Sequence, residues 1–268
     1  MSQPTSEKKT RQMKLAKGLA MAGVFTLLGS ILLGVLSTLT SGYTTVIHAE
    51  DIEMIQTEEP KSGDPKAVVH TTLGDMTFAL YPSECPKAVE NFCTLAESGY
   101  YNNTYVFRIE PEVFFSAGAP QADGSLNAGE EAAERERIPQ ELSPKLWPLR
   151  GSLCALTSSV EGGIWKRVTK TEDIYTGSRF LVADTIEMTD EIRQGLENDT
   201  DEAMKPVAEA FLEYGGIPNY AQQVTVFGQL TEGFEVLDAI TSAAVAENDE
   251  AHHPKDEIKI LTVEITKF

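Results

Sequence analysis

The stretch from residue 86 to residue 111 constrains the fold more than any other part of the chain, because a helical pattern gives way there to a strand pattern. Pro86 suits the first position of a helix, and Gly99 ends the element. Between them, apolar residues recur at helical spacing: Val89, Phe92 and Leu95. After a short turn, the residues from 105 to 109 alternate as in a strand, which Pro111 bounds. The sequence therefore predicts a short amphipathic helix followed directly by a β-strand.

Arg108 lies on this expected strand and faces away from its aromatic neighbours Tyr105 and Phe107. On spacing alone, the commoner explanation is an arginine that is solvated or paired with an acid. Glu110 or a carboxylate from an insertion would be that acid, and Arg108 would then only stabilise the strand. The other interpretation is a functional arginine, which the rest of the sequence favours.

Several tracts accompany the arginine strand. They are VVHTTLGDMTFALYP (68–82), ENF (90–92), Gly151 to Leu153, Gly177-Ser178 before Phe180, and TVFGQLTEGFEVLDAI (225–240). In this combination and order they resemble the cyclophilin-type peptidyl-prolyl cis-trans isomerases. The resemblance covers most of residues 66 to 268, and its specificity comes from the joint occurrence of the tracts.

Short alternating strands with turn signals predict a mainly β fold, either a barrel or a sandwich. The resemblance selects a closed eight-stranded antiparallel barrel capped by two helices. The second helix would begin near Glu232, and the last strand would run from Ile258 to Phe268. Two segments, 121–150 and 184–214, have no counterpart in a minimal member of the family. We expect the second to be helical, to pack near the substrate groove and to serve as a specificity or docking element.

The N-terminus has the pattern of a membrane anchor. Residues 1–17 carry five basic side chains and one acidic one, whereas residues 18–47 carry no charge. A bilayer requires about 20 apolar residues, which favours a retained transmembrane segment over a cleaved leader, the alternative. The basic head places the N-terminus in the cytoplasm and the C-terminal domain outside, or secreted if the leader is cleaved. The acidic, proline-containing residues 48–65 are expected to form a solvated linker to a domain spanning 66–268.

Charge and ligand spacing exclude several classes of function. The net charge of −19 makes nucleic acid a poor partner. The three cysteines and four histidines lack the spacing of a metal site, and the cysteines form no disulfide framework, so we expect neither a metal nor a cofactor. His252 and His253 lie in a polar tract and are expected to be solvated.

The resemblance implies a peptide-binding groove beside Arg108. The implied proline pocket consists of Val113, Phe114, Leu181 and Tyr220, and the neighbouring positions are Ser116, Leu156, Thr157, Arg179, Phe180, Asn219 and Val224. Apolar character is kept in the pocket, although residue shapes differ. The family usually has glutamine at Ser116 and Arg179, tryptophan at Asn219 and histidine at Val224.

Two functions follow. In the first, the chain isomerises X-Pro bonds in exported or membrane proteins, and the Arg108 guanidinium stabilises the twisted amide without any covalent step. In the second, the altered groove and the insertions make the domain a membrane-tethered binding module with weak or no activity. The retained Arg108 supports the enzyme, and its altered polar neighbours support the binding module. The sequence does not specify an oligomeric state.

Overall fold

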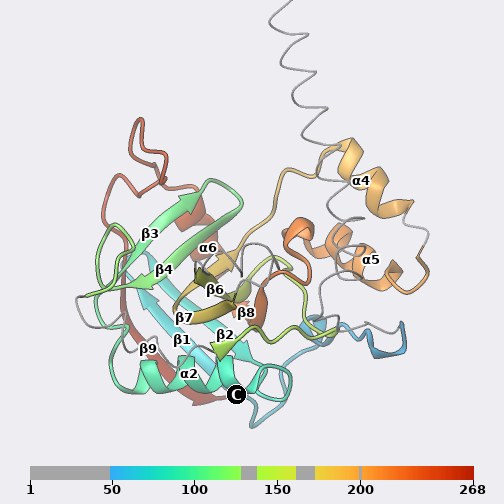
Figure 1. Cartoon of the computed structure of the whole chain (residues 1–268), viewed down its shortest axis with the longest axis horizontal. Coiled ribbons are helices and arrows are strands. Elements are labelled where there is room, and N and C mark those ends of the chain that lie inside the picture. The colour runs from blue at the N-terminus through green and yellow to red at the C-terminus, as the bar shows by residue number, and fades with distance from the viewer. Residues whose placement is uncertain (1–48, 128–137, 161–172, 199–200) are drawn as a thin grey trace, which may run out of the picture.

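The computed structural model describes residues 49–127, 138–160, 173–198 and 201–268 (Figure 1). The strands are β1 (Pro65–Thr71), β2 (Gly74–Leu80), β3 (Thr104–Glu110), β4 (Phe114–Ala119), β5 (Ile138–Pro139), β6 (Ser152–Val160), β7 (Asp173–Ala183), β8 (Thr225–Glu232) and β9 (Lys259–Lys267). The α-helices are α2 (Pro86–Glu97), α4 (Asp190–Glu197), α5 (Lys205–Tyr214) and α6 (Phe234–Thr241). The 3₁₀ turns are η1 (Ala49–Asp51), η2 (Ile55–Thr57) and η4 (Pro218–Tyr220).

The strands close into a barrel. Their hydrogen-bonded order is β4-β3-β9-β1-β2-β8-β6-β7, and a further pairing of β4 with β7 joins the two ends. The short strand β5 pairs with β7 outside this ring, and the pairings are antiparallel throughout the described sheet. Closure satisfies the backbone donors and acceptors that an open sheet would leave at its edges. The expected closed eight-stranded antiparallel barrel is therefore confirmed.

Aromatic side chains fill the barrel beside α2. The Phe92 ring lies 5.2 Å from Tyr101, 5.7 Å from Phe180 and 5.3 Å from Phe227, measured between ring centroids. The expected helix and strand around residues 86–111 are present as α2 and β3. Helix α6 contributes Leu237 and Ile240 to the same buried cluster. Burial of this apolar surface is the main force that holds the helices on the barrel.

The helices of the second insertion form a separate small core beside the barrel. Val207 and Phe211 of α5 are buried with Trp147 and Leu149, which precede β6. Figure 1 shows α4 and α5 together at one side of the barrel. The expected helices between residues 184 and 214 are confirmed, and Gly215 caps α5 with a φ of 76°.

The segment before β1 departs from a fully solvated linker: Ile52 and Met54 pack against the core of the insertion helices, and Ile55 packs against the main core. The Gln56 side chain is 7% exposed and reaches the backbone of Trp147. Most neighbouring residues are exposed or half-buried, as an acidic linker requires. Burial of a long polar side chain is favourable here because hydrogen bonds within the protein replace those to water.

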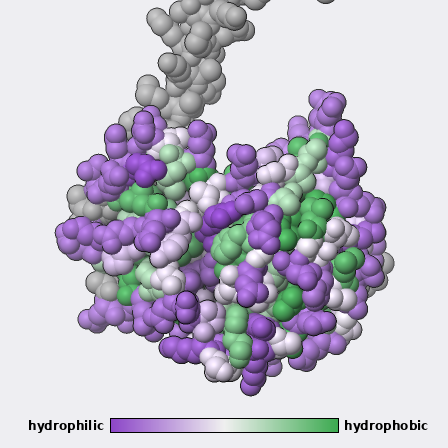
Figure 2. Space-filling model, turned by 180° about the vertical axis from the view of Figure 1, so that it is seen from behind, coloured by the Kyte–Doolittle hydropathy of each residue, from purple (hydrophilic) through white to green (hydrophobic). Residues whose placement is uncertain are grey.

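The expected membrane anchor, residues 18–47, and the basic head, 1–17, lie outside the described residues. Within the described part of the chain, each helix is too short or too polar to cross a membrane. On the face seen in Figure 2, hydrophilic side chains predominate and apolar ones gather in separate areas.

Candidate active site

Arg108 belongs to a row of residues that face one another across three strands. Arg108 of β3 pairs in register with Ser116 of β4, and Ser116 pairs with Leu181 of β7. Directly paired residues of antiparallel strands lie on the same face of the sheet. Ser116 and Leu181 are almost fully buried, whereas the Arg108 side chain is 45% exposed. Of the three paired residues, Ser116 and Leu181 are therefore buried, and Arg108 exposes its guanidinium to solvent.

A tight turn between β3 and β4 creates this register. The Val113 amide donates to the Glu110 carbonyl at 2.9 Å, and Pro111 occupies the second position of the turn. Glu112 has a φ of 59°, which the third position of such a turn requires. The turn folds Phe114 back toward Arg108, so two residues close in sequence meet in space.

The guanidinium of Arg108 contacts both an acid and an aromatic ring. Its NH2 group donates to Glu110 Oε2 at 2.8 Å, and its Cζ atom lies 5.7 Å from the centre of the Phe114 ring. The Phe114 and Tyr220 rings are 6.2 Å apart. An aromatic ring thus lies next to a permanent positive charge, and the hydrogen bond to Glu110 uses one of the five guanidinium N–H donors. The pairing of Arg108 with Glu110, which is the structural alternative to a functional arginine, is therefore present.

The other predicted pocket residues lie on two loops, one between β3 and β4 and one between α5 and β8. Val113 and Tyr220 are half-buried and pack against the main core, and η4 positions Tyr220 directly after the insertion helices. Val224, before β8, also packs against this core. The Asn219 Oδ1 atom is shielded from solvent and accepts no hydrogen bond from the described residues.

Other predicted positions are placed differently. Phe180 is 2% exposed and packs on the rings of Phe92 and Tyr101, so it lies in the main buried cluster, as Leu181 does at 3% exposed. Adjacent strand residues point to opposite faces, which separates Phe180 from Leu181. Arg179 donates to the Gly124 carbonyl at 2.9 Å and so connects β7 to the first insertion.

Leu156 and Thr157 lie together on β6 and are half-buried. Leu156 packs against the main core, and Thr157 pairs in register with Thr176 of β7. Their strand is the neighbour of the Leu181 strand, but the described contacts do not join either residue to Arg108.

His252 was missed by sequence reasoning. Its Nδ1 atom is shielded from solvent and lies 3.1 Å from Glu110 Oε1, while the side chain as a whole is 36% exposed, so the expected solvation holds for only part of the ring. In the sequence, the polar tract around His252 gave no indication of this contact with Glu110. Its neighbour His253 turns to Asp249 on the same loop, with Nδ1 and Oδ2 2.6 Å apart.

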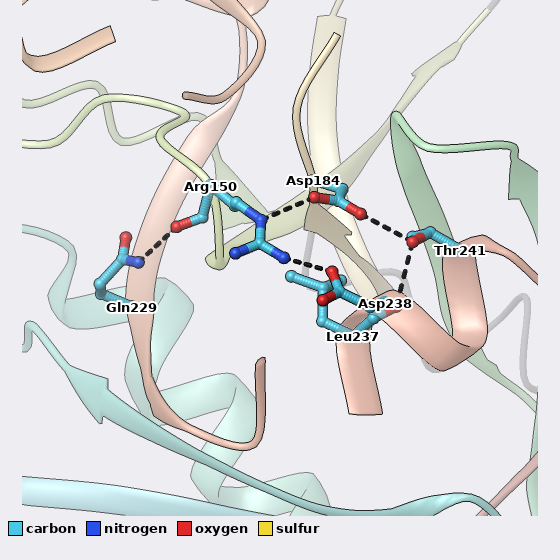
Figure 3. A network of polar contacts seen from close by, with 6 residues as sticks. All are labelled: Arg150, Asp184, Gln229, Leu237, Asp238 and Thr241. Atoms are coloured by element: carbon cyan, nitrogen blue, oxygen red, sulfur yellow. Dashed lines mark hydrogen bonds and ion pairs between the residues drawn. The ribbon is translucent and has the colours of Figure 1, made fainter. Parts of the chain in front are cut away.

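A buried polar network supports the turn that carries the pocket (Figure 3). Arg150 Nε donates to Asp184 Oδ1 at 2.9 Å, and a terminal NH2 of Arg150 pairs with Asp238. The Thr241 hydroxyl donates to Asp184 Oδ2 at 2.7 Å. The Asp184 amide donates to the Val113 carbonyl at 2.7 Å. Asp184 therefore joins helix α6 to the turn, because its carboxylate binds Thr241 and its backbone amide binds Val113.

Thiol chemistry does not fit this site. Cys154 pairs in register with Leu181, and burial raises its pKa far above the ordinary value. Burial also raises the pKa of Cys85 to about 12. A thiol must ionise before it acts as a nucleophile. Both side chains are therefore neutral near pH 7 and are not activated nucleophiles.

Comparison with known proteins agrees with this geometry. The family model for the cyclophilin type peptidyl-prolyl cis-trans isomerases matches residues 66–265. A Staphylococcus saprophyticus protein named as a peptidyl-prolyl cis-trans isomerase is 31% identical over 209 residues, which are 78% of this chain and 95% of that protein. A similarly named protein of Staphylococcus aureus (strain COL) is 32% identical over 197 residues, covering 73% of this chain and 90% of that protein.

A longer relative and a solved structure extend the comparison. A Streptococcus pyogenes protein named as a bifunctional phosphatase/peptidyl-prolyl cis-trans isomerase is 30% identical over 218 residues, and the match spans 42% of its length. The crystal structure of a Cryptosporidium parvum cyclophilin type isomerase, obtained with the dipeptide Ala-Pro, has a TM-score of 0.52 and 25% identity. It covers 75% of this chain and 98% of the other. The chain therefore belongs to the cyclophilin-type peptidyl-prolyl cis-trans isomerase family.

Proposed function

We propose that this chain accelerates cis-trans isomerisation of X-Pro bonds and that Arg108 is its catalytic residue. The observation that carries the proposal is the partly exposed guanidinium beside the Phe114 and Tyr220 rings. Rotation about a peptide bond has a barrier of about 18–20 kcal/mol because conjugation is lost when the amide twists. The proline nitrogen of the twisted amide becomes a better hydrogen-bond acceptor. A fixed guanidinium that donates to it lowers the barrier without a nucleophile or a base.

The apolar surface supplies the complementary part of the site. The pyrrolidine ring would pack on Phe114 and Tyr220, with Val113 and Leu181 around them. The related C. parvum structure obtained with Ala-Pro supports proline-containing peptides as the substrate class. Binding of the ring next to Arg108 would bring the X-Pro nitrogen within reach of the guanidinium.

The proposed site of action is the outer face of a membrane. The support is the uncharged span of residues 18–47 behind a basic head, with the acidic segment that follows as the connection to the barrel. The substrates would then be exported or membrane proteins during folding, where slow prolyl isomerisation limits the rate.

A peptide-binding module with little activity is the second candidate. Two observations favour it: Glu110 engages one end of the Arg108 guanidinium, and Ser116 is 1% exposed. Such a module would hold proline-containing partners without lowering the rotational barrier.

NMR exchange spectroscopy on a blocked X-Pro peptide separates the two candidates. We expect the full-length chain, kept in solution with a non-ionic detergent, to accelerate cis-trans exchange, and Arg108→Ala to abolish most of the acceleration. Arg193→Ala is the matched control, because this arginine is exposed on α4. Peptide binding without acceleration would establish the binding module. Full activity in Arg108→Ala would refute the role of Arg108.

A further inference from the structure

The Glu110 carboxylate lies between two basic side chains. Oε2 accepts from Arg108 at 2.8 Å, and Oε1 lies 3.1 Å from His252 Nδ1. Each oxygen has its own partner, so both contacts exist at once. The three side chains form a row, Arg108–Glu110–His252, that ends at the candidate catalytic residue.

The row is partly withdrawn from solvent. The side chains of Glu110 and His252 are 29% and 36% exposed, and the His252 Nδ1 atom itself is shielded. Partial burial makes these charge interactions stronger than those of a fully solvated pair. The contact to Glu110 is an ion contact, since Nδ1 has no well-aligned hydrogen-bond partner among the described residues.

The loop that carries His252 is fixed to β3. The Ile109 amide donates to the His252 carbonyl at 2.9 Å, and His252 has a φ of 56°. The other nearby acid on the loop, Asp249, accepts from the backbone amide of His253 and contacts its ring. Glu110 is therefore the carboxylate that faces the His252 ring, and Arg108 is the cation beyond it.

Building on the proposed isomerase function, we propose that Glu110 positions Arg108 and screens its charge, and that His252 controls this screening. When His252 is neutral, Glu110 cancels much of the positive potential that Arg108 offers to the twisted amide. When His252 is protonated, the same carboxylate is shared between two cations and the row gains one positive charge. Electrostatic stabilisation of the transition state then increases.

The proposal predicts a pH-dependent isomerase. Imidazole is the side chain whose charge ordinarily changes between pH 5 and 8. Catalytic efficiency should therefore be higher at about pH 5 than at about pH 8. Interactions of partly exposed charges are modest, so we expect about a threefold rise.

Three variants test the row in full-length protein on a blocked X-Pro peptide without titratable groups. Glu110→Gln keeps an acceptor for Arg108 but removes the charge that screens it, so its kcat/KM at high pH should rise to about the low-pH value of the wild type. His252→Asn should be independent of pH and match the high-pH value, and asparagine tolerates the left-handed backbone there. His253→Asn is the matched control and should keep the wild-type pH profile.

A second measurement uses NMR to detect the electrostatic coupling between Arg108 and His252 without measuring catalysis. The Arg108 side-chain ¹⁵Nε signal should move with pH in the wild type and should not follow that titration in His252→Asn. A flat wild-type rate profile combined with Arg108-dependent activity would overturn the proposal, as would a slope that persists in His252→Asn. A lack of acceleration at every pH would instead refute the isomerase function itself.

Discussion

At the scale of single residues, burial decides which side chains are chemically available. Arg108 retains exposure beside the groove, whereas Cys85 and Cys154 are fully enclosed. Leu181 pairs with Ser116 in the row that includes Arg108, whereas Phe180 packs on the aromatic rings beside α2, and both side chains are buried. Residue type alone did not separate these two neighbours, because both are large and apolar.

The buried thiols predict a loss of stability at high pH. Burial raises the pKa of Cys85 from its ordinary 9.0 to about 12, so its contribution is complete below pH 9 and is lost as the pH rises toward 12. The free energy of unfolding should fall by about 1.4 kcal/mol per pH unit for this thiol, because the unfolded chain ionises first.

Urea unfolding between pH 8 and about pH 10.5 checks this prediction. Cys85→Ala should have a shallower pH dependence than the wild type. Cys93→Ala is the matched control, because Cys93 is only half-buried and its replacement should alter the slope less. Equal slopes for all three proteins would contradict the prediction.

At the scale of elements, the polar side chains of loops join parts that are distant in sequence. Gln56 Nε2 donates to the Trp147 carbonyl at 2.9 Å, and the Trp147 amide donates back to Gln56 Oε1. Gln56 Nε2 also contacts Gln229 Oε1 of β8 at 2.9 Å. This one side chain attaches the segment before β1 to the barrel and to the core of the insertion helices.

Removal of Gln56 should loosen that attachment. Gln56→Ala leaves the buried amide of Trp147 without its acceptor, whereas the Trp147 carbonyl keeps the Leu149 amide and the Ser152 hydroxyl as donors. An unsatisfied buried amide costs about 1–3 kcal/mol. We expect a lower free energy of unfolding and faster hydrogen exchange in residues 50–65. Gln194→Ala, on the exposed surface of α4, is the matched control. Unchanged exchange in Gln56→Ala would show that the segment is held by other contacts.

The network around Asp184 makes a comparable prediction for α6 and the pocket turn. Asp184→Asn leaves Arg150 without its more buried charged partner and should lower the free energy of unfolding by about 1–3 kcal/mol. Asp238→Asn removes the other partner, whose side chain is 57% exposed, and should cost less than about 1 kcal/mol. Thermal unfolding of both variants measures the difference. An equal loss in the two would argue against Asp184 as the central residue.

At the scale of the whole molecule, charge and hydropathy are divided along the chain. A basic head and an uncharged span precede an acidic remainder, and the total net charge is −19. This order is typical of a protein that is held at a membrane with its acidic domain in the extracytoplasmic space. An acidic surface of this kind makes nucleic acid a poor partner and would keep the domain soluble in the proposed location.

The proposed anchor can be tested by cell fractionation. In a bacterial host, we expect the full-length chain to sediment with membranes and to be digested by protease added to spheroplasts. A chain that lacks residues 1–47 should remain in the soluble cytoplasmic fraction and be protected. Mass spectrometry of the mature N-terminus distinguishes a retained anchor from a cleaved leader. A protected full-length chain would contradict the proposed orientation.

The sequence by itself determined the local elements and the family. The spacing of apolar residues predicts α2 and β3. The order of the tracts that resemble the family, from residue 68 to residue 240, predicts the closed barrel. These features depend on near neighbours in the chain, whose preferences act over one helical turn or one strand alternation.

Only the tertiary structure decided which polar groups meet. His252 reaches Glu110, Gln56 reaches Trp147, and Asp184 connects α6 to the pocket turn. These contacts join segments far apart in sequence, and they depend on barrel closure and on loop conformations that no local pattern encodes. The sequence thus determined that Arg108 lies on a strand of a barrel, whereas the fold decided which charges surround it, because electrostatic interaction depends on distance in space rather than along the chain.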